Sequence, residues 1–581
     1  MAVSEDLTCK VKPFSSDSTN TTDGSSVTVQ IKSFIINVFF DGTWNNMRNN
    51  NLYRGLVRDP ALYKDTPEQK ETPSVEESYK RKQAFKPLRD QSLIINMHDN
   101  LSYHREATTV EWLYKGFEPK NDNSTGNIAV YIEGTGTLDK DTDGAFAAGS
   151  GWGSKRGFDA KAKRAFEYIA NELDNKGKRG SKFDLLQINI YGFSRGAASA
   201  RYFSNLLRET YEDTETKQTC YMTDRFKFKN PLQPCQVQIG FIGIFDTVVS
   251  VGLKQDNDAK EWKQEMTQPN PSGVVPEPPK SYKVVHIAAS NEARTFFSLY
   301  DIHSSMEKGY GVEFRIPGCH TDIGGGLGVG EEIVDGTVVI AGKNEVVCYV
   351  RERHEGNAQP QEKNYFNSEG DHDMGKFWLF DNVLTRFLRQ KRNASIVDAS
   401  LLARELINEG YFEEGEYITH LNELPPYKAN LEGSKLYLVD NSYEIHETIT
   451  GGIPSRTVTD RTLWGYRQQL NSGYPRVSCH LMYEFIKKYN VDYFSLFLNY
   501  LEAQIPDSFL QGIFDEFKGV ALAHDDACVT KGKGEIKVIK LSDKAKSRQL
   551  FKNYLHWSGD GEWMDAQIFQ WGEAVRTVHH G

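Results

Sequence analysis

The stretch from residue 185 to residue 198, Leu-Leu-Gln-Ile-Asn-Ile-Tyr-Gly-Phe-Ser-Arg-Gly-Ala-Ala, decides how this chain folds. Its first part alternates, with Leu186, Ile188 and Ile190 on one face, which predicts a buried strand. The strand runs into Gly-Phe-Ser-Arg-Gly and then into small residues that favour a helix. The order strand, tight turn, helix is the context that a nucleophile elbow requires.

Two glycines make that corner sterically feasible. Gly192 and Gly196 remove the side chains that would crowd a sharp turn from strand to helix. Ser194 then lies at the tip of the turn, with its hydroxyl above the sheet and near the positive end of the new helix. The pattern therefore predicts Ser194 as a nucleophile.

The composition is that of a soluble globular protein. The chain has 581 residues, of which 39% are hydrophobic and 25% charged, and its length suggests two to four domains. A net charge of −10 and the absence of a basic stripe argue against nucleic-acid binding. No uninterrupted apolar run approaches the roughly 18 residues that a membrane-spanning helix requires.

Compartment and redox state follow from the N-terminus and the cysteines. Residues 1–26 are polar and lack an apolar core, so we expect synthesis in the cytoplasm without a signal peptide. The seven cysteines show no Cys-x-x-Cys spacing, which argues against a disulfide framework or a zinc site. A single bridge between Cys220 and Cys235 stays open. No cofactor is expected.

Further apolar runs extend the strand–helix alternation. Residues 34–40, 128–132, 237–245 and 312–316 are predicted strands, and an apolar face predicts a helix over 160–173. Alternating strands and helices favour a parallel sheet. The sequence predicts an α/β-hydrolase-like, doubly wound, mostly parallel sheet with insertions and a mainly helical second domain.

Three parts of the chain differ in character. Residues 1–30 are predicted to be a flexible polar tail. Residues 31–350 form the catalytic domain, with irregular insertions at about 50–120 and 255–280. Residues 351–581 are predicted to form a mainly helical domain, the expected site of any docking to a membrane or to a partner protein. Helices are predicted there at 377–392, 397–412, 480–488 and 493–504, and strands around 435–439 and 537–541.

A serine hydroxyl needs a base to take its proton, and that base needs a carboxylate to orient it. Asp246 and His320 follow Ser194 in the order of α/β-hydrolases. Each comes just after a predicted core strand, so parallel strands bring all three to one edge of the sheet. We assign Ser194 as nucleophile, His320 as general acid–base and Asp246 as orienting carboxylate.

Other residues compete for these roles. His286 and His303 also follow Asp246, but they lie in predicted helices (His286 within 284–294) rather than at a strand end. Asp322 is a rival acid, which at two residues from His320 is as well suited to brace the loop.

An acyl-transfer site also requires two preorganised N–H donors for the oxyanion. The elbow supplies the backbone amide of Arg195. The loop after the first strand supplies a second donor through Gly42 or Thr43, and the loop 134–136 is the alternative.

One acidic loop matches the opening of a calcium-binding loop. Asp139, Asp141, Asp143 and Gly144 have the spacing, but the position that needs a glutamate is Ser150. An Asp-rich turn is the preferred interpretation, so we predict no metal site and keep these three aspartates as a weak candidate. The glycine-rich segment 149–153 behind it is expected to be a mobile loop.

Together the motifs carry a family resemblance. In chain order they are Phe39-Phe-Asp-Gly-Thr-Trp-Asn-Asn46, Glu133-Gly-Thr-Gly136, Gly192-Phe-Ser-Arg-Gly-Ala197, Gly243-Ile-Phe-Asp-Thr-Val248 and Pro317-Gly-Cys-His-Thr-Asp-Ile-Gly-Gly-Gly326. This set resembles the α/β-hydrolase domain of the first family of bacterial type VI secretion lipase effectors, over residues 31–330. The family's triad falls on Ser194, Asp246 and His320.

The resemblance implies an activity and partners. It implies a phospholipase of A1 or A2 type that hydrolyses membrane glycerophospholipids of a rival bacterium after injection into its periplasm. It also implies a VgrG spike protein as carrier and a cognate immunity protein. Positional specificity, headgroup preference and oligomeric state do not follow from the sequence.

Two alternatives stay open. A cytoplasmic serine esterase acting on soluble esters would have the same fold and triad, and a non-catalytic interaction module could use the hydrolase domain as a scaffold. A lipase also needs an apolar surface. Residues 491–501 are the best candidate for an interfacial helix, although packing into the second domain is favoured, and residues 377–380 are a weaker one.

Overall fold

The computed structural model describes most of the predicted core. The described residues are 33–53, 101–117, 126–141, 143, 155–177, 185–212, 219–221, 236–249, 264, 282–294, 297–326, 331–334, 337–340, 343–355, 399–421, 433–445, 456–489, 497–557, 569–570, 573–574, 576 and 578–580. The predicted N-terminal tail, the glycine-rich loop 149–153, the helix at 377–392, residues 491–496, the Cys220–Cys235 pairing and nearly all of loop 255–280 lie outside these residues.

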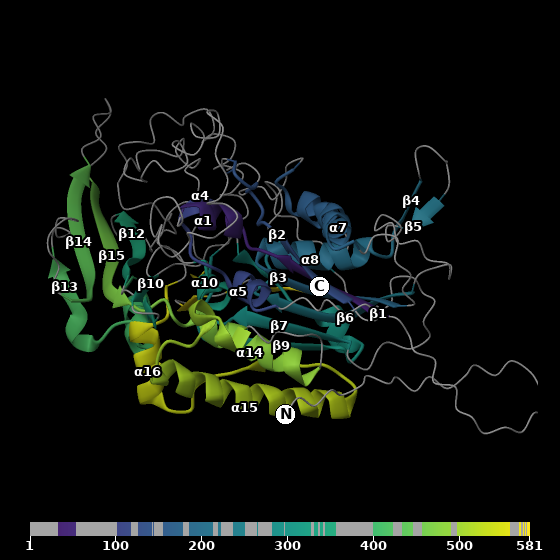
Figure 1. Ribbon diagram of the computed structural model, residues 1–581. Coiled ribbons are helices and arrows are strands. Elements are labelled where there is room, and N and C mark those ends of the chain that lie inside the picture. The colour runs from purple at the N-terminus through teal and green to yellow at the C-terminus, as the bar shows by residue number, and fades with distance from the viewer. Residues whose placement is uncertain are drawn as a thin grey trace, which may run out of the picture.

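A seven-stranded sheet forms the centre of the molecule (Figure 1). Across the sheet the strands are β16 (Ile536–Val538), β9 (Gly311–Ile316), β7 (Lys283–Ala289), β6 (Gln236–Phe245), β3 (Leu185–Phe193), β1 (Ser33–Phe40) and β2 (Gly126–Ile132). Every neighbouring pair is parallel. The predicted α/β fold with a parallel sheet is thereby confirmed.

Strand order places one edge of this sheet at a reversal point. The chain passes from β1 to β2 on one side and then returns across β1 to β3, β6, β7 and β9 on the other. In open parallel sheets such a reversal leaves a crevice beyond the carboxyl ends of the two strands, where ligands bind. Here these ends lead into Asp41 and Ser194.

Helices cover both faces of the sheet (Figure 1). On one face α7 (Phe158–Asn175) and α8 (Arg195–Leu206) bury the side chains predicted to alternate inward, among them Leu186, Ile188 and Ile190. The opposite face packs against α5 (Thr109–Lys115), α14 (Pro475–Lys488) and α15 (Ser508–Lys531). Helix α5 lies within the segment predicted as an irregular insertion; the structure instead buries it on the sheet.

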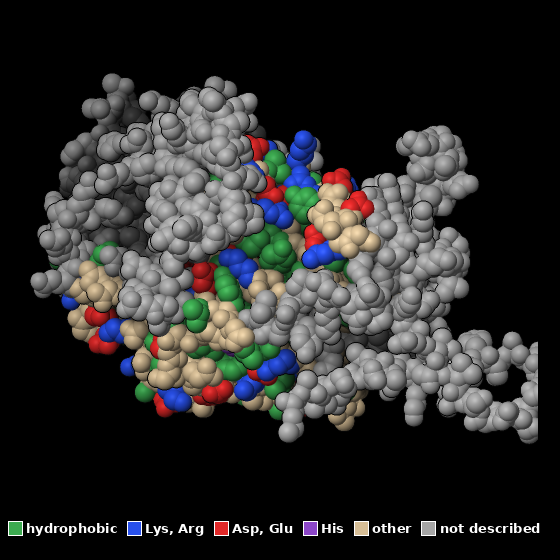
Figure 2. Space-filling model, in the orientation of Figure 1, with side chains coloured by type: hydrophobic (Ala, Val, Ile, Leu, Met, Phe, Trp, Pro, Cys, Tyr) green, Lys and Arg blue, Asp and Glu red, His purple; other side chains and the backbone are tan. Residues whose placement is uncertain are grey.

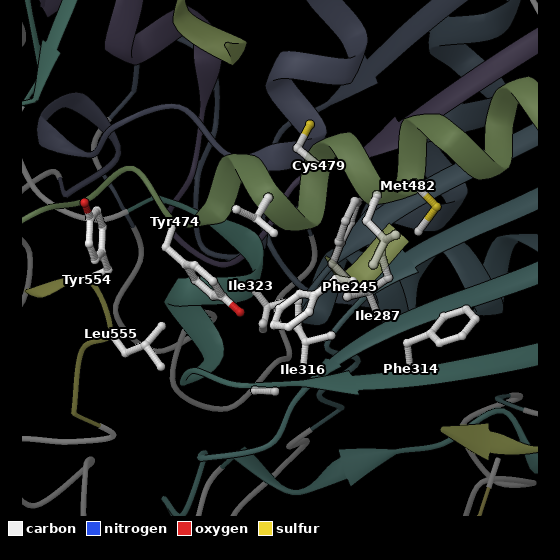
Figure 3. Close-up of a cluster of buried hydrophobic side chains, with 14 of the residues drawn as sticks. Phe245, Ile287, Phe314, Ile316, Ile323, Tyr474, Cys479, Met482, Tyr554 and Leu555 are labelled. Carbon is white, nitrogen blue, oxygen red and sulfur yellow. The ribbon is translucent and has the colours of Figure 1, made fainter. Parts of the chain in front are cut away.

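The second face shows how far the C-terminal half enters this core (Figure 3). Met482 of α14 packs with Ile287 and Phe314 of the sheet, and Phe314 stacks on Phe485 with ring centroids 5.2 Å apart. Short α10 (His320–Gly324) contributes Ile323 to the same cluster. The helix that follows the site is therefore held against the sheet by residues far along the chain.

The boundary predicted at residue 350 does not separate two packing units among the described residues. Strand β16 pairs with β9 as the edge of the central sheet, and α14 and α15 cover it. Three residues of strand give too short an apolar pattern to reveal this pairing from sequence. Residues from both halves of the chain thus pack on the central sheet, and the two-domain division stays a prediction.

The C-terminal half also holds more strand than predicted. A four-stranded sheet has the order β12 (Lys343–Glu355), β15 (Arg456–Leu470), β14 (Lys435–Ile445) and β13 (Tyr417–Leu421) and lies at the left of Figure 1. Helices α13 (Ala399–Glu409) and α16 (Lys544–Asn553) contact it. Cross-strand pairing of long polar strands, which leaves no helical period, explains why these strands were underestimated.

The remaining elements are short. They are α1 (Met47–Tyr53), α4 (Leu101–His104), β4 (Thr210–Glu212), β5 (Thr219–Tyr221), β8 (Leu299–Tyr300), α9 (His303–Glu307), β10 (Glu331–Val334), β11 (Thr337–Ile340), η7 (Glu414–Glu416), η8 (Phe497–Asn499), η9 (Leu501–Ala503), β17 (Phe569–Gln570), β18 (Glu573–Ala574) and β19 (Val578–His579).

The candidate interfacial segment is only partly helical where it is described. Residues 497–503 form two 3-10 turns rather than the predicted α-helix, and Phe497 is buried against Tyr483 and His480. Leu498 and Leu501 are 55% and 50% exposed. No helix in the described part of the chain combines the length and apolar character needed to cross a membrane. On the face shown in Figure 2, charged side chains of both signs are interspersed among the visible described residues.

Candidate active site

The turn after β3 has the strained geometry of a nucleophile elbow. Ser194 has φ 58° and ψ −129°, a backbone conformation that L-residues rarely adopt. A Cβ at Gly196 would lie 2.2 Å from the Asp41 carbonyl oxygen, and one at Gly192 would lie 2.7 Å from the Ala197 Cα. Both glycines are therefore required by close backbone approach, as the sequence predicts.

The structure brings the three predicted catalytic side chains into one hydrogen-bonded chain. The Ser194 hydroxyl lies 2.8 Å from His320 Nε2, and His320 Nδ1 lies 2.5 Å from Asp246 Oδ2. A carboxylate can only accept, so Nδ1 carries the proton and Nε2 is free to take the serine proton. All three residues are at most 4% exposed.

Buried charges set the protonation states. Burial lowers the pKa of His320, against the opposing effect of the Asp246 carboxylate, so the imidazole is neutral at physiological pH. Burial alone would raise the pKa of Asp246, but the Arg576 guanidinium and the His320 hydrogen bond outweigh it and hold the pKa well below its ordinary value. These shifts favour a neutral imidazole beside an ionised carboxylate.

The imidazole is held from several directions. Its ring packs between Phe193 and Phe297, with ring centroids 4.7 and 4.9 Å away. The backbone N–H of His320 donates to Glu292 at 3.1 Å. Burial alone would raise the pKa of Glu292, but its ion pair with Arg294 lowers the pKa to about 2, which keeps this acceptor ionised.

Backbone strain gathers around the same site. Five non-glycine residues of the described chain have positive φ, and Trp44 (59°), Ser194 (58°) and Asp246 (39°) are among them. Each directly follows, or nearly follows, the carboxyl end of a central strand. Strained conformations persist where the surrounding structure over-determines them and cluster at functional sites, so this concentration supports a catalytic role for the edge.

The predicted oxyanion loop lies beside the elbow. The N–H groups of Gly42, Trp44 and Asn45 donate to the Asp41 side chain and to two backbone carbonyls. Among the described contacts Thr43 N–H has no acceptor, and Arg195 N–H is the first of α8, where no helical carbonyl is available. Of the three predicted donors, Arg195 and Thr43 fit the role better than Gly42.

Side chains fix this loop to the elbow and to the sheet. Arg195 Nε donates to Thr43 Oγ1 at 2.7 Å. The Asp41 carboxylate accepts from Tyr131 and from Thr108 Oγ1 as well as from Gly42 N–H. Burial raises the pKa of Asp41 to about 7, against these hydrogen bonds. The loop position thus depends on a buried polar cluster.

The alternative oxyanion loop acts as a scaffold. Gly134 N–H donates to the Asn45 carbonyl at 2.8 Å, and the Thr135 carbonyl accepts from Trp44 N–H at 3.0 Å. Glu133 is buried and bridges Lys161 and Arg164 of α7. These bonds tie the 134–136 loop to the loop after β1 and leave the glycine amides engaged.

The rival residues have other partners. His286 lies in strand β7, not in the predicted helix; its Nε2 accepts from Thr247 N–H at 3.1 Å and its Nδ1 donates to Glu313. His303 pairs with Glu307 on exposed α9. Asp322 accepts from Cys319 N–H and binds His556 Nδ1 at 2.7 Å. Asp322 therefore braces the loop and is not directed at the imidazole.

The weak calcium candidate is occupied by protein donors. Asp139 pairs with Arg48, Asp141 with Arg156, and Asp143 accepts from Ser102 N–H and Oγ. Its carboxylates thus face different partners rather than one cation. A second group of metal-ligand types in the described chain, His524, Cys528 and Glu535, lies at the end of α15, and Glu535 is paired with Lys531.

Sequence reasoning missed the partners that hold Asp246 and His320. Glu292 follows β7, whose strand character was misassigned, and Arg576 lies 330 positions from the aspartate that it contacts. Neither residue lies in one of the five sequence motifs that carry the family resemblance. Only knowledge of long-range pairing could have identified them.

The low pKa of His320 has a measurable consequence for pH dependence. A general base must be neutral, so activity falls as pH drops through its pKa. Because burial lowers that pKa below the ordinary 6.5, we expect the acidic limb of kcat/KM for a soluble ester to have its midpoint below pH 6.5. A profile from about pH 4.5 to pH 8.5 tests this; a midpoint above 6.5 contradicts it.

The fold is α/β-hydrolase-like, and Ser194 lies at the tight turn between β3 and α8. Residues 208–338 match the family model described as "T6SS, Phospholipase effector Tle1-like, catalytic domain", a range that contains Asp246 and His320. The resemblance to type VI secretion lipase effectors is confirmed: residues 208–338 are similar to the catalytic domain of Tle1-like phospholipase effectors.

Two solved structures align with this chain, and the first of them supports the fold. One, described as "Structure of the Tle1 effector bound to the VgrG spike from the Type 6 secretion system", aligns over 97% of this chain and 99% of its own, with 19% identity and a TM-score of 0.50. An uncharacterized protein from Pseudomonas aeruginosa aligns over 52% of this chain and 42% of its own, with 20% identity and a TM-score of 0.27. Comparison with curated proteins gives no match.

Proposed function

We propose that this chain is a serine phospholipase of A1 or A2 type that hydrolyses glycerophospholipid esters through an acyl-enzyme. The observation that carries the proposal is the unbroken hydrogen-bonded chain from Ser194 through His320 to Asp246 at the carboxyl edge of the sheet. The Tle1-like catalytic domain supports the phospholipid as substrate class.

The geometry supports a two-step reaction. His320 Nε2 takes the proton of Ser194 as the serine oxygen attacks the ester carbonyl, and Asp246 stabilises the imidazolium through the Nδ1 proton. The tetrahedral intermediate collapses when the imidazolium gives its Nε2 proton, taken from Ser194, to the leaving lysophospholipid oxygen. Water, deprotonated by His320, then attacks the acyl-serine and releases a free fatty acid and the serine hydroxyl.

The oxyanion is stabilised in this proposal by the backbone N–H groups of Arg195 and Thr43. Helix α8 and the Arg195 side chain hold the two donors, since Arg195 Nε donates to Thr43 Oγ1. Preorganised donors of this kind supply about 3 kcal/mol each to acyl transfer. The Gly42 amide, which donates to Asp41, acts as a support for the loop.

One further observation favours a phospholipid over a neutral soluble ester. The Arg195 guanidinium lies directly after the nucleophile, burial lowers its pKa to about 10, and no described group accepts from its Nη1. A partly buried cation without a counter-ion is costly unless an anion occupies the site. The phosphodiester of a bound glycerophospholipid is such an anion.

The proposal extends to delivery. We infer that a VgrG spike protein carries the chain out through type VI secretion, that it acts in the periplasm of the target cell, and that the producer holds a cognate immunity protein. Support comes from the family match and from the similar Tle1 effector, which was solved bound to VgrG. The proposal does not assign the contacts with these partners to particular residues.

Fatty-acid release from vesicles tests the activity and its class. We expect purified protein to release fatty acid from phosphatidylethanolamine–phosphatidylglycerol vesicles, and to do so equally in excess EDTA, because Asp139, Asp141 and Asp143 face protein donors. Vesicles labelled separately at the two acyl positions distinguish A1 from A2. Cleavage of short soluble esters without release from vesicles would contradict the phospholipase and leave a soluble esterase.

A further inference from the structure

An arginine that is distant in sequence binds both oxygens of the Asp246 carboxylate. Arg576 Nη1 lies 2.6 Å from Asp246 Oδ1, and Nη2 lies 2.8 Å from Oδ2. The two side chains are 7% and 0% exposed. Arg576 Nε also donates to the Phe297 carbonyl at 2.8 Å, so all three guanidinium nitrogens donate hydrogen bonds to Asp246 or Phe297.

The segment that carries Arg576 is fixed to the site by backbone pairing. Strand β19 pairs in parallel with β8, and Asp301 N–H donates to the His579 carbonyl at 3.0 Å. Strand β8 is in turn bonded to the residue after the triad aspartate, because Tyr300 N–H donates to the Thr247 carbonyl. The C-terminal segment and the Asp246 loop thus form one connected structure.

A buried arginine holds β8 in place beneath this segment. Arg201 of α8 donates to the carbonyls of Tyr300 and Asp301 at 3.0 and 2.9 Å and to that of Gln264. Helix α8 begins at the nucleophile elbow. Ser194, Asp246 and Arg576 are therefore held by one connected set of contacts that runs through α8 and β8.

The hydrogen bonds of Asp246 show what Arg576 adds. Without Arg576, the carboxylate would keep one backbone donor, Ala289 N–H at 2.8 Å on Oδ1, and the imidazole on Oδ2. A carboxylate with one bond to each oxygen can still rotate about its Cβ–Cγ bond. The bidentate fork fixes its plane and supplies a counter-charge to a fully buried anion.

We propose that Arg576 is a positioning residue of the triad, and that β19 pairs with β8 to keep Arg576 at the active site. The role of Arg576 is to fix the orientation of the Asp246 carboxylate toward His320 Nδ1 and to balance its charge. The inference rests on the proposed serine mechanism, since it gives Arg576 a function through Asp246.

The charge on Arg576 gives this role a measurable effect on the pKa of His320. Asp246 and Glu292 raise that pKa, and Arg294 lowers it. Arg576 binds both oxygens of the Asp246 carboxylate, so its positive charge also opposes protonation of the ring. Loss of Arg576 leaves the Asp246 charge unbalanced and removes a repelling cation. Both changes raise the pKa of His320, so the acidic limb of activity moves to higher pH.

The test compares Arg576→Met, which removes charge and fork, with Arg576→Lys, which keeps the charge alone. On a soluble ester we expect R576M to lower kcat by roughly 10- to 100-fold with little change in KM and to shift the acidic limb upward by about one pH unit. R576K should lower kcat by less than R576M does and leave the midpoint of the acidic limb at its wild-type pH. Lys531→Met, which removes an exposed ion pair on α15, should match wild type.

A readout independent of turnover separates this inference from the proposed function. Titration of the His320 ring by NMR, in full-length wild type and R576M, should show the higher pKa in the variant even if no ester is cleaved. An R576M protein with wild-type kcat and an unshifted limb would overturn the inference. So would a loss of rate that comes with a lower Tm and an unshifted His320 titration, since this indicates only a structural role.

Discussion

Replacement of Ser194 by alanine is expected to reduce fatty-acid release from phospholipid vesicles by at least about 10⁴-fold. In the proposed mechanism the hydroxyl oxygen is the atom that bonds to the acyl group, and it lies 2.8 Å from His320 Nε2, the base that activates it. Methyl in place of hydroxymethyl at the strained elbow leaves the fold intact. The initial rate of release, measured at matched protein concentration and with circular dichroism of both proteins, checks this.

Ser199 offers a matched control on the same helix. Its hydroxyl donates to the carbonyls of Phe158 and Arg195 and is buried, but it does not approach His320. Ser199→Ala should lose about 1 kcal/mol of stability and keep its rate. A fluorophosphonate probe should label wild type and S199A but not S194A. Release by S194A at a wild-type rate would remove Ser194 from the mechanism.

The sequence could predict this site because its signals are local. Each predicted catalytic residue follows a short apolar run, and the carboxyl ends of parallel strands meet at one edge whatever the strand order. Ser194, Asp246 and His320 therefore come together without knowledge of which strands are neighbours. The glycines of the elbow add a steric reason that is visible in the sequence itself.

Periodicity could not decide elements that are buried on both sides. The run Val-Val-His-Ile-Ala-Ala at 284–289 fits a buried helix as well as a buried strand. Pairing with β6 on one side and β9 on the other makes it strand β7. His286 then points at Glu313 and Thr247 and supports the backbone next to Asp246, instead of lying on a helix surface.

Long-range pairing accounts for the rest of the difference. The seventh strand, β16, is three residues long and two of them are exposed, so no apolar pattern marks it. Arg576 lies near a two-residue strand and gains its role only from the pairing of β19 with β8. Such contacts depend on the packed core, which local propensity does not encode.

Asp246→Asn is expected to lower kcat by about 10⁴-fold while the fold is retained. The carboxylate now accepts from the His320 Nδ1 proton at 2.5 Å, which fixes the tautomer that leaves Nε2 able to take the serine proton. An amide nitrogen facing Nδ1 would favour the other tautomer, whose Nε2 already carries a proton. It would also leave the Arg576 fork without its anionic partner.

The matched control for this prediction is Asp322→Asn, the other aspartate near His320. Asp322 is as buried as Asp246, but its oxygens accept from Cys319 N–H and bind His556. Its substitution should lower Tm through the loss of that buried contact and reduce kcat by less than about 100-fold. Because the two variants make the same chemical change, the ratio of their kcat values separates orientation of the base from bracing of its loop. A larger loss of kcat in D322N than in D246N would show that Asp322, and not Asp246, is the carboxylate that orients His320.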